Sequence, residues 1–110
     1  MTLSGDAIIE EEKLTHYLLK RQPYNDKSKF LKTAGYELKN WKQLEDDLRK
    51  QILPLIAQIT EENEYGVFYN ITGLLKGPND SVLDITTIWL FEHKTQQTRF
   101  ITLFPNKNKR

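Results

Sequence analysis

The longest run of mainly apolar residues lies in the second half of the chain, over residues 81–91. It is rich in β-branched and aromatic side chains, which is typical of a strand covered on both faces. Alternate residues of a strand point to opposite faces, and only one of the two faces carries a charge, that of Asp84. We therefore predict a central strand whose uncharged face lies in the core. That face consists of Leu83, Ile85, Thr87, Trp89 and Phe91.

Two further stretches of strand-like character flank this segment. Residues 67–76 precede it and end at the turn sequence Gly-Pro-Asn-Asp of residues 77–80, and residues 98–104 follow it across residues 93–97. Connectors this short join antiparallel neighbours. The pattern predicts an antiparallel meander, in which Gly73 indicates a bulge or a close approach of another segment.

The first half of the chain has helical periodicity instead. Leu14, Tyr17 and Leu18 recur at helical spacing behind three glutamates, whose negative charge suits a helix N-terminus. This spacing predicts a helix over residues 10–21, which Pro23 ends.

Two more helices are expected before the strands. An apolar stripe within residues 26–34, closed by Gly35, predicts a short second helix. A third helix begins after Asn40 and is kinked or ended at Pro54. We expect a further helical turn over residues 55–60 and a loop over residues 61–64.

These elements define an α+β fold, with three N-terminal helices packed on a three- to four-stranded antiparallel meander. The length of 110 residues suits one domain, over residues 1–105, followed by a disordered basic tail over residues 106–110. The sheet face away from the helices is the expected place for a site. No segment is long and uncharged enough to span a membrane and no signal peptide is recognisable, so the expected location is cytoplasmic.

The inventory of reactive side chains excludes several classes of chemistry. The chain has no cysteine, which excludes disulfides, thiolate nucleophiles and cysteine-ligated zinc. Its two histidines, His16 and His93, belong to different predicted elements. No phosphate-binding glycine loop, metal-binding histidine pair or nucleophile elbow occurs. We therefore expect neither a metal nor another cofactor.

The net charge is only +1, but the charge is unevenly distributed. Residues 13–32 contain six basic residues and a single acid, Asp26, which gives this region a local charge of +5. A polyanionic partner would explain such a region, and so would a solvated helix face without any function. The basic residues are Lys13, Lys20, Arg21, Lys27, Lys29 and Lys32.

Lys, Arg, Thr and Tyr side chains are the groups that stabilise a phosphoryl transition state without a metal. Arg99 and Thr102 lie in the last predicted strand, where a spacing of three makes them face opposite sides unless a bulge intervenes. A surface ion pair is the alternative role for Arg99. An exposed position on the strand face is the alternative for Asp84, which interrupts an apolar strand.

Several short motifs carry a resemblance to a known family. They are K-L-x-x-Y-L-L at residues 13–19, K-S-K-F-L-x-x-x-G-Y at residues 27–36, G-L-L-K-G-P-N at residues 73–79, and R-F-I-T-L-F-P at residues 99–105. With these motifs the chain resembles an uncharacterised, largely cyanobacterial family of small toxin-like domains, found beside a short antitoxin-like protein or at the end of larger secreted toxins. Helices before an antiparallel sheet are also similar, at the level of fold, to the barnase, EndoU, colicin and RelE group of ribonucleases.

The resemblance implies a metal-independent endoribonuclease in which Lys13 and Lys29 hold phosphate, Arg99 stabilises the transition state and Thr102 orients the ribose. An interaction module or antitoxin-like partner without catalysis is the alternative. The implied partners are RNA and a small antitoxin-like protein, with no membrane, and a homodimer is left open. The candidate catalytic residues are Arg99, Thr102 and Lys29, and the candidate substrate-binding residues are Lys13, Lys27 and Trp89.

Overall fold

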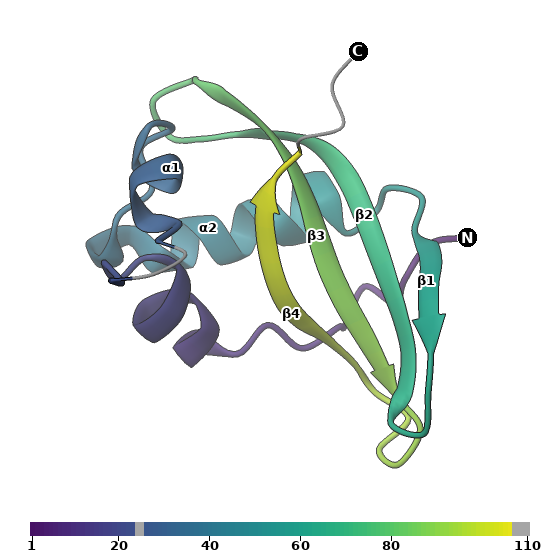
Figure 1. The fold of residues 1–110 in the computed structure, drawn as a ribbon. Coiled ribbons are helices and arrows are strands. Elements are labelled where there is room, and N and C mark those ends of the chain that lie inside the picture. Colours follow the sequence, from purple (N-terminus) through teal and green to yellow (C-terminus); the bar gives the residue numbers. More distant parts are fainter. Residues whose placement is uncertain (24–25, 107–110) are drawn as a thin grey trace.

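The computed structural model describes residues 1–23 and 26–106, and these form an α+β fold around one antiparallel sheet (Figure 1). The sheet has four strands in the order β1-β2-β3-β4, each hydrogen-bonded to its neighbours in the sequence. The meander predicted from the apolar runs is therefore confirmed, with β3 between β2 and β4. The strands are β1 (Gln58–Glu62), β2 (Gly66–Lys76), β3 (Val82–Glu92) and β4 (Thr98–Pro105).

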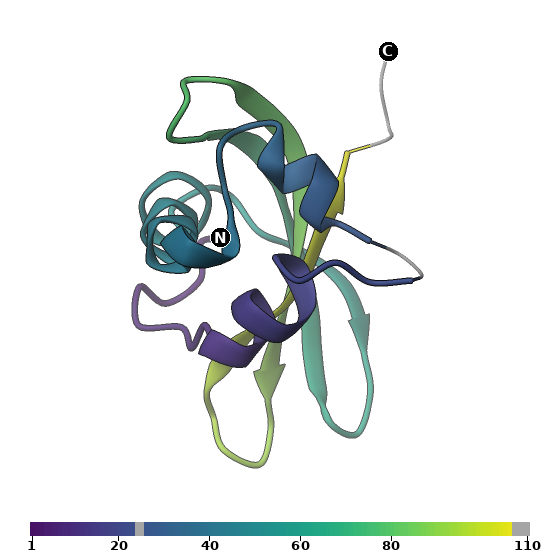
Figure 2. The ribbon, with the colours of Figure 1, turned by 90° about the vertical axis from the view of Figure 1, so that its left-hand side faces the viewer.

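Among the described residues, five short helical segments precede the strands and pack against one side of the sheet (Figures 1 and 2). The last three follow one another without a break and form the longest helical stretch, where three separate helices had been predicted in all. The segments are η1 (Lys13–Leu18), α1 (Ser28–Lys32), η2 (Leu38–Asn40), α2 (Trp41–Asp47) and η3 (Leu48–Ile52).

The predicted core face of β3 is confirmed. Ile85, Thr87 and Trp89 are fully buried and lie against the helices, whereas Val82 on the opposite face is exposed. Thr87 shows how a polar group is accommodated there: its hydroxyl donates to the Ile71 carbonyl oxygen at 3.1 Å and accepts the Trp89 indole N–H at 2.7 Å. Burial of the Thr87 hydroxyl and the Trp89 indole N–H costs little free energy, because both groups are hydrogen-bonded.

The segment after Pro54 was predicted wrongly. Residues 58–62 form strand β1 and not a helical turn followed by a loop. β1 pairs with β2, with Gln58 opposite Asn70 and Glu62 opposite Val67. All its side chains are exposed, so the strand has no buried stripe that periodicity could detect. The first helix was also predicted too long, since η1 ends at Leu18.

The end of β4 bears on two further expectations. Asn106 was placed in the disordered tail, yet its backbone amide donates to the Asp84 carbonyl oxygen at 2.9 Å and its side-chain amide to the Asp84 carboxylate at 3.2 Å. Asp84 is half-buried and hydrogen-bonded at this strand end. The rest of the predicted tail, residues 107–110, lies outside the described residues.

Two contacts outside the named strands join other segments to the sheet. Ile8 forms a short parallel bridge with Arg99, in which its amide donates to the Thr98 carbonyl oxygen and its carbonyl oxygen accepts the Phe100 amide, both at 2.8 Å. The β2–β3 turn docks on the end of α1, where the Asn79 side chain donates to the Thr33 carbonyl oxygen at 3.1 Å. The N-terminal segment around Ile8 and the end of α1 are thus joined to the sheet.

Candidate functional site

Three side chains from separate segments meet at the outer edge of β4. The ammonium nitrogen of Lys27, just before α1, lies 3.1 Å from the phenol oxygen of Tyr17 in η1. The same ammonium lies 3.4 Å from the hydroxyl oxygen of Thr102 in β4. Two of these residues, Lys27 and Thr102, were predicted as site residues from the sequence. We call Tyr17, Lys27 and Thr102 the tyrosine cluster.

Local structure explains why these three groups meet. Leu14 and Leu18 of η1 are fully buried, which holds the helix on the sheet and leaves Tyr17 on its outer side, 36% exposed. In β4 the register shifts between the partners of Ile88 and Trp89. This bulge places Thr102 opposite Ile88, on the sheet face away from the core.

The surroundings lower the pKa of the Tyr17 phenol below its ordinary value of 10.0. The interaction with the Thr102 hydroxyl is the largest cause, followed by the hydrogen bond from Lys27. Partial burial acts in the opposite direction, and the charges of Lys27 and Lys13 add smaller lowering effects. All the lowering contacts favour the phenolate, so at a given pH a larger fraction of Tyr17 is in this proton-accepting form than of an isolated tyrosine.

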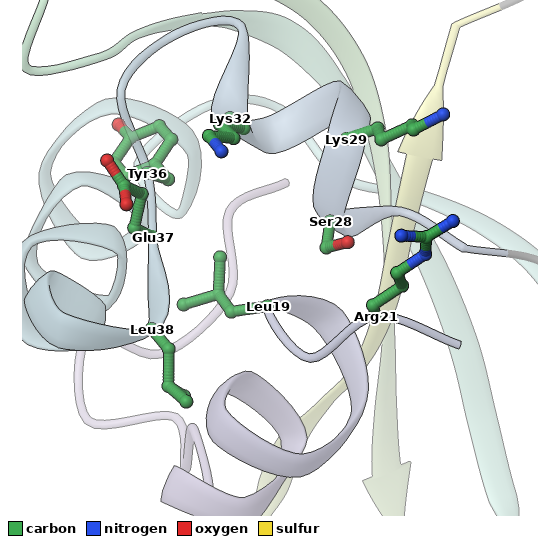
Figure 3. A pocket seen from close by; sticks show the side chains of 8 residues that line it. All are labelled: Leu19, Arg21, Ser28, Lys29, Lys32, Tyr36, Glu37 and Leu38. Atoms are coloured by element: carbon green, nitrogen blue, oxygen red, sulfur yellow. The ribbon is translucent and has the colours of Figure 1, made fainter.

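A second feature, which we call the basic hollow, lies between the end of η1, α1 and the segment leading into η2 (Figure 3). Its volume is about 300 Å³. Lys32 extends from α1 towards the middle of the labelled side chains, while Arg21 and Lys29 extend towards the side where β4 runs (Figure 3). The lining residues are Leu19, Arg21, Ser28, Lys29, Lys32, Tyr36, Glu37 and Leu38.

The wall of the hollow is held by groups that are already paired. The Tyr36 hydroxyl donates to the Asp47 carboxylate at 2.6 Å and lies 3.2 Å from the Lys76 carbonyl oxygen. Burial of Tyr36 and the negative charge of Asp47 raise the pKa of its phenol. The Ser28 hydroxyl donates to the Asp26 carboxylate at 2.7 Å. Neither hydroxyl is an ionisable group that could act on a ligand near neutral pH.

Arg99 is occupied by two carboxylates. Its guanidinium lies 3.2 Å from a carboxylate oxygen of Glu10 and 3.1 Å from one of Glu92, and its side chain is 23% exposed. The β4 bulge brings Arg99 and Thr102 to the same sheet face, opposite Leu90 and Ile88. The guanidinium therefore joins the beginning of the helical region to β3 and β4. This is the surface ion pair that was the alternative role for Arg99.

The other sequence-predicted residues are distributed as follows. Trp89 has no exposed surface and packs edge-to-face on Phe100 with ring centroids 5.2 Å apart, so it contributes to the core and offers a ligand no surface. Lys29 lines the basic hollow. Lys13 is half-buried and close enough to the tyrosine cluster for its charge to act on Tyr17.

Sequence reasoning did not assign the ionisable side chains of Tyr17, Arg21 and Lys32 to a site. Tyr17 was interpreted as part of the apolar stripe of its helix, and Arg21 and Lys32 were only counted in the local charge. The signal that could have found them is the concentration of positive charge over residues 13–32, since all three lie within it. The partners of Tyr17 could not be found in this way, because Thr102 is far away in the sequence.

Two further features of the described residues bear on the site. Within residues 1–23 and 26–106, no group of three or more His, Cys, Asp or Glu side chains comes together as metal ligands would. The same described ranges contain no helix with the length and apolar character that crossing a membrane requires.

The fold and the sites define a small α+β domain whose cationic side chains gather around a tyrosine at the edge of an antiparallel sheet. The chain belongs to the family described as domain of unknown function DUF6883, whose model matches residues 4–107. No curated protein and no solved structure shows significant similarity to the chain.

Proposed function

We propose that this domain is a toxin-like, metal-independent endoribonuclease of a toxin-antitoxin-type pair, acting in the cytoplasm. The observation that supports the proposal is the tyrosine cluster: a phenol with a lowered pKa, contacted by an ammonium and a hydroxyl, in the part of the chain with the highest positive charge. Cleavage of RNA requires little from a protein beyond a proton acceptor and positive charge, because the ribose supplies its own nucleophile, the 2′-hydroxyl.

In the proposed reaction, the Tyr17 phenolate accepts the proton of the 2′-hydroxyl as that oxygen attacks the neighbouring phosphorus. The bond between the 2′-oxygen and phosphorus forms, the bond from phosphorus to the 5′-oxygen breaks, and the 5′-oxygen takes a proton from water. The hydroxide that remains takes the proton from the Tyr17 phenol, which restores water and the phenolate. The products are a 2′,3′-cyclic phosphate and a 5′-hydroxyl. The charge that develops on the phosphoryl oxygens is stabilised by the Lys27 ammonium, which lies 3.1 Å from the Tyr17 phenol oxygen.

The remaining residues have supporting roles in this proposal. Thr102 orients the ribose and keeps the pKa of Tyr17 low, and Lys13 and Lys29 hold phosphates of the bound strand. Arg99 acts as a positioning residue, since its two carboxylate partners keep β4 and the start of the helical region together. The exposed cations of the site would also attract an acidic antitoxin-like protein, which would block access to RNA.

The test is incubation of the purified protein with single-stranded RNA and with tRNA in the presence of EDTA. We expect cleavage that leaves 2′,3′-cyclic phosphate ends. Tyr17→Phe should slow it by about 100- to 10,000-fold, the range for loss of a general base. Tyr65→Phe is the matched control, because Tyr65 is an exposed tyrosine in the β1–β2 turn, and it should cleave like the parent. Absence of cleavage by the parent, with or without divalent ions, would refute the assignment.

One observation favours a second function, a protein-interaction module without catalysis. The open sheet face carries exposed apolar side chains on adjacent strands, Leu74 of β2, Val82 of β3 and Phe104 of β4. Exposed apolar groups gathered on one face are typical of interaction surfaces. If the parent does not cleave RNA, sedimentation of the protein alone and with a neighbouring gene's product would show whether this face binds a second copy or another protein.

A further inference from the structure

The basic hollow is lined by more cations than carboxylates, although the charge of Asp26 nearby acts on Arg21. Arg21, Lys29 and Lys32 line it together with a single carboxylate, that of Glu37. Each of the three cations is exposed, and none has a salt bridge to a carboxylate of a described residue. Like charges held this close repel one another, which an anionic ligand would relieve.

The hollow also has an apolar side that faces the solvent. Leu38 is 49% exposed although it lies in the first turn of a continuous helical stretch, and the buried Leu19 also lines the hollow. A ligand that matches both the cationic side and the apolar side of the hollow has an anionic group and a flat, weakly polar surface. A nucleotide has this combination, and the volume of about 300 Å³ lies at the lower end for ligand pockets.

The hollow and the tyrosine cluster are linked through α1. Lys27 of the cluster directly precedes this helix, and Lys29 and Lys32 of the hollow follow within its five residues. Helix residues rise about 1.5 Å each, so the backbones of the three lysines lie within a short length of the chain. A strand that places one phosphate against Lys27 reaches Lys29 with its next nucleotide.

We propose that the basic hollow binds the nucleotide next to the cleaved phosphodiester in a single RNA strand. Its phosphate is held by Arg21, Lys29 and Lys32, and its base lies against Leu38. The domain thereby recognises at least two successive nucleotides and prefers a strand to a free mononucleotide. This inference rests on the proposed ribonuclease function for the direction of the strand, while binding in the hollow can be measured without any cleavage.

The probe is a short, labelled single-stranded RNA with 2′-O-methyl groups, which lack the nucleophile and cannot be cleaved. Its affinity is measured by fluorescence anisotropy at several salt concentrations. Each phosphate contact on a single strand contributes about 0.7 to the slope of log affinity against log salt concentration. The double variant Arg21→Gln, Lys32→Gln should therefore show a slope shallower by about 0.7 and weaker binding at low salt.

The matched control is the double variant Lys50→Gln, Lys94→Gln, which changes two exposed cations outside both sites. We expect it to keep the slope of the parent. Leu38→Ser should weaken binding by the same factor at every salt concentration, because it removes an apolar contact and no charge. Thermal melts of all variants should stay close to that of the parent, since the changed side chains are exposed.

The outcomes separate the two proposals. An unchanged slope in the hollow variant, or a nucleoside 5′-monophosphate that binds as tightly as the strand, overturns the assignment of the hollow and leaves the ribonuclease proposal standing. If the parent cleaves no RNA but the hollow variant shows the shallower slope, the ribonuclease proposal fails and the hollow remains a nucleotide site. A parent that does not bind the probe even at low salt overturns the inference.

Discussion

The Lys27 ammonium lies 3.1 Å from the phenol oxygen of Tyr17, although Tyr17 lies in η1 and Lys27 directly before α1. The same ammonium also lies 5.2 Å from the centre of the Tyr17 ring. Since Thr102 is the third member, the cluster joins both segments to the last strand. Its formation therefore depends on tertiary structure, and its chemistry should disappear when any one of the three groups is removed.

The first prediction concerns pH. The pKa of Tyr17 is lowered in the folded protein, so the phenolate form is favoured there and the cleavage rate should rise with pH and level off below 10.0. Thr102→Val removes the largest cause of the lowering, and its rise should occur at higher pH. A pH titration of the Tyr17 ring signals by NMR, compared between parent and variant, measures this shift directly.

The same lowering has a consequence for stability. A group whose pKa falls on folding adds stability above its unfolded value, here 10.0, and this contribution is lost as the pH falls through the lowered value. The free energy of unfolding, measured across that alkaline range, should therefore rise less with pH for Thr102→Val than for the parent. Equal pKa values in parent and variant would mean that Thr102 does not act on Tyr17.

The second prediction concerns Arg99. Because its guanidinium is already paired with Glu10 and Glu92, Arg99→Ala should lower the melting temperature by a few degrees and change cleavage only slightly. Arg99→Lys keeps one charge but not the two-sided pairing, and should give an intermediate melt. A loss of about 100-fold in cleavage with an unchanged melt would instead assign Arg99 to stabilisation of the transition state.

The third prediction concerns the turn that docks on α1. A Cβ atom on Gly77 would lie 2.1 Å from the Ala34 carbonyl oxygen, a backbone atom that cannot move without shifting α1. Gly77→Ala should therefore destabilise the fold by about 1–3 kcal/mol, as overpacking does, and weaken RNA binding through the lysines of α1. Gly5→Ala is the control, since nothing lies within 4 Å of its added methyl group. Urea unfolding of both variants makes the comparison.

The fourth prediction concerns the two tryptophans. Trp89→Ala removes a side chain with no exposed surface and should cost about 3–5 kcal/mol of unfolding free energy. Trp41 is only partly buried, beside the Lys42 ammonium, so Trp41→Ala should cost clearly less. Urea unfolding followed by circular dichroism gives both values. A cost below 1 kcal/mol for Trp89→Ala would contradict the observed packing.

The strands with a buried face could be predicted from the sequence, and the exposed strand could not. Trp89 and Ile85 mark the core face of β3 because burial selects apolar residues at every second position. β1 has no buried position at all, and pairing with β2 is what makes it a strand. Such a segment carries no periodicity, so propensity alone led to the wrong element.

The candidate site shows a similar division. The charge of residues 13–32 pointed to Lys27 and Lys29, because solvent-exposed cations are visible in composition. The role of Tyr17 was hidden, since its helical spacing matches that of Leu14 and Leu18, which do face the core. Arg99 and Thr102 share a sheet face because of the bulge in β4. No residue type in that strand indicates a bulge, so the shared face could not be predicted.

The bridge between Ile8 and β4 has a consequence for self-association. An unpaired strand edge can recruit a strand from a second molecule, and Ile8 occupies backbone groups of Thr98 and Phe100 on the outer edge of β4. Sheet extension is therefore directed to β1 at the other end. There, Glu61 and Glu62 give the edge strand of each copy a negative charge, so growth of the sheet from molecule to molecule should be opposed at neutral pH and eased in acid.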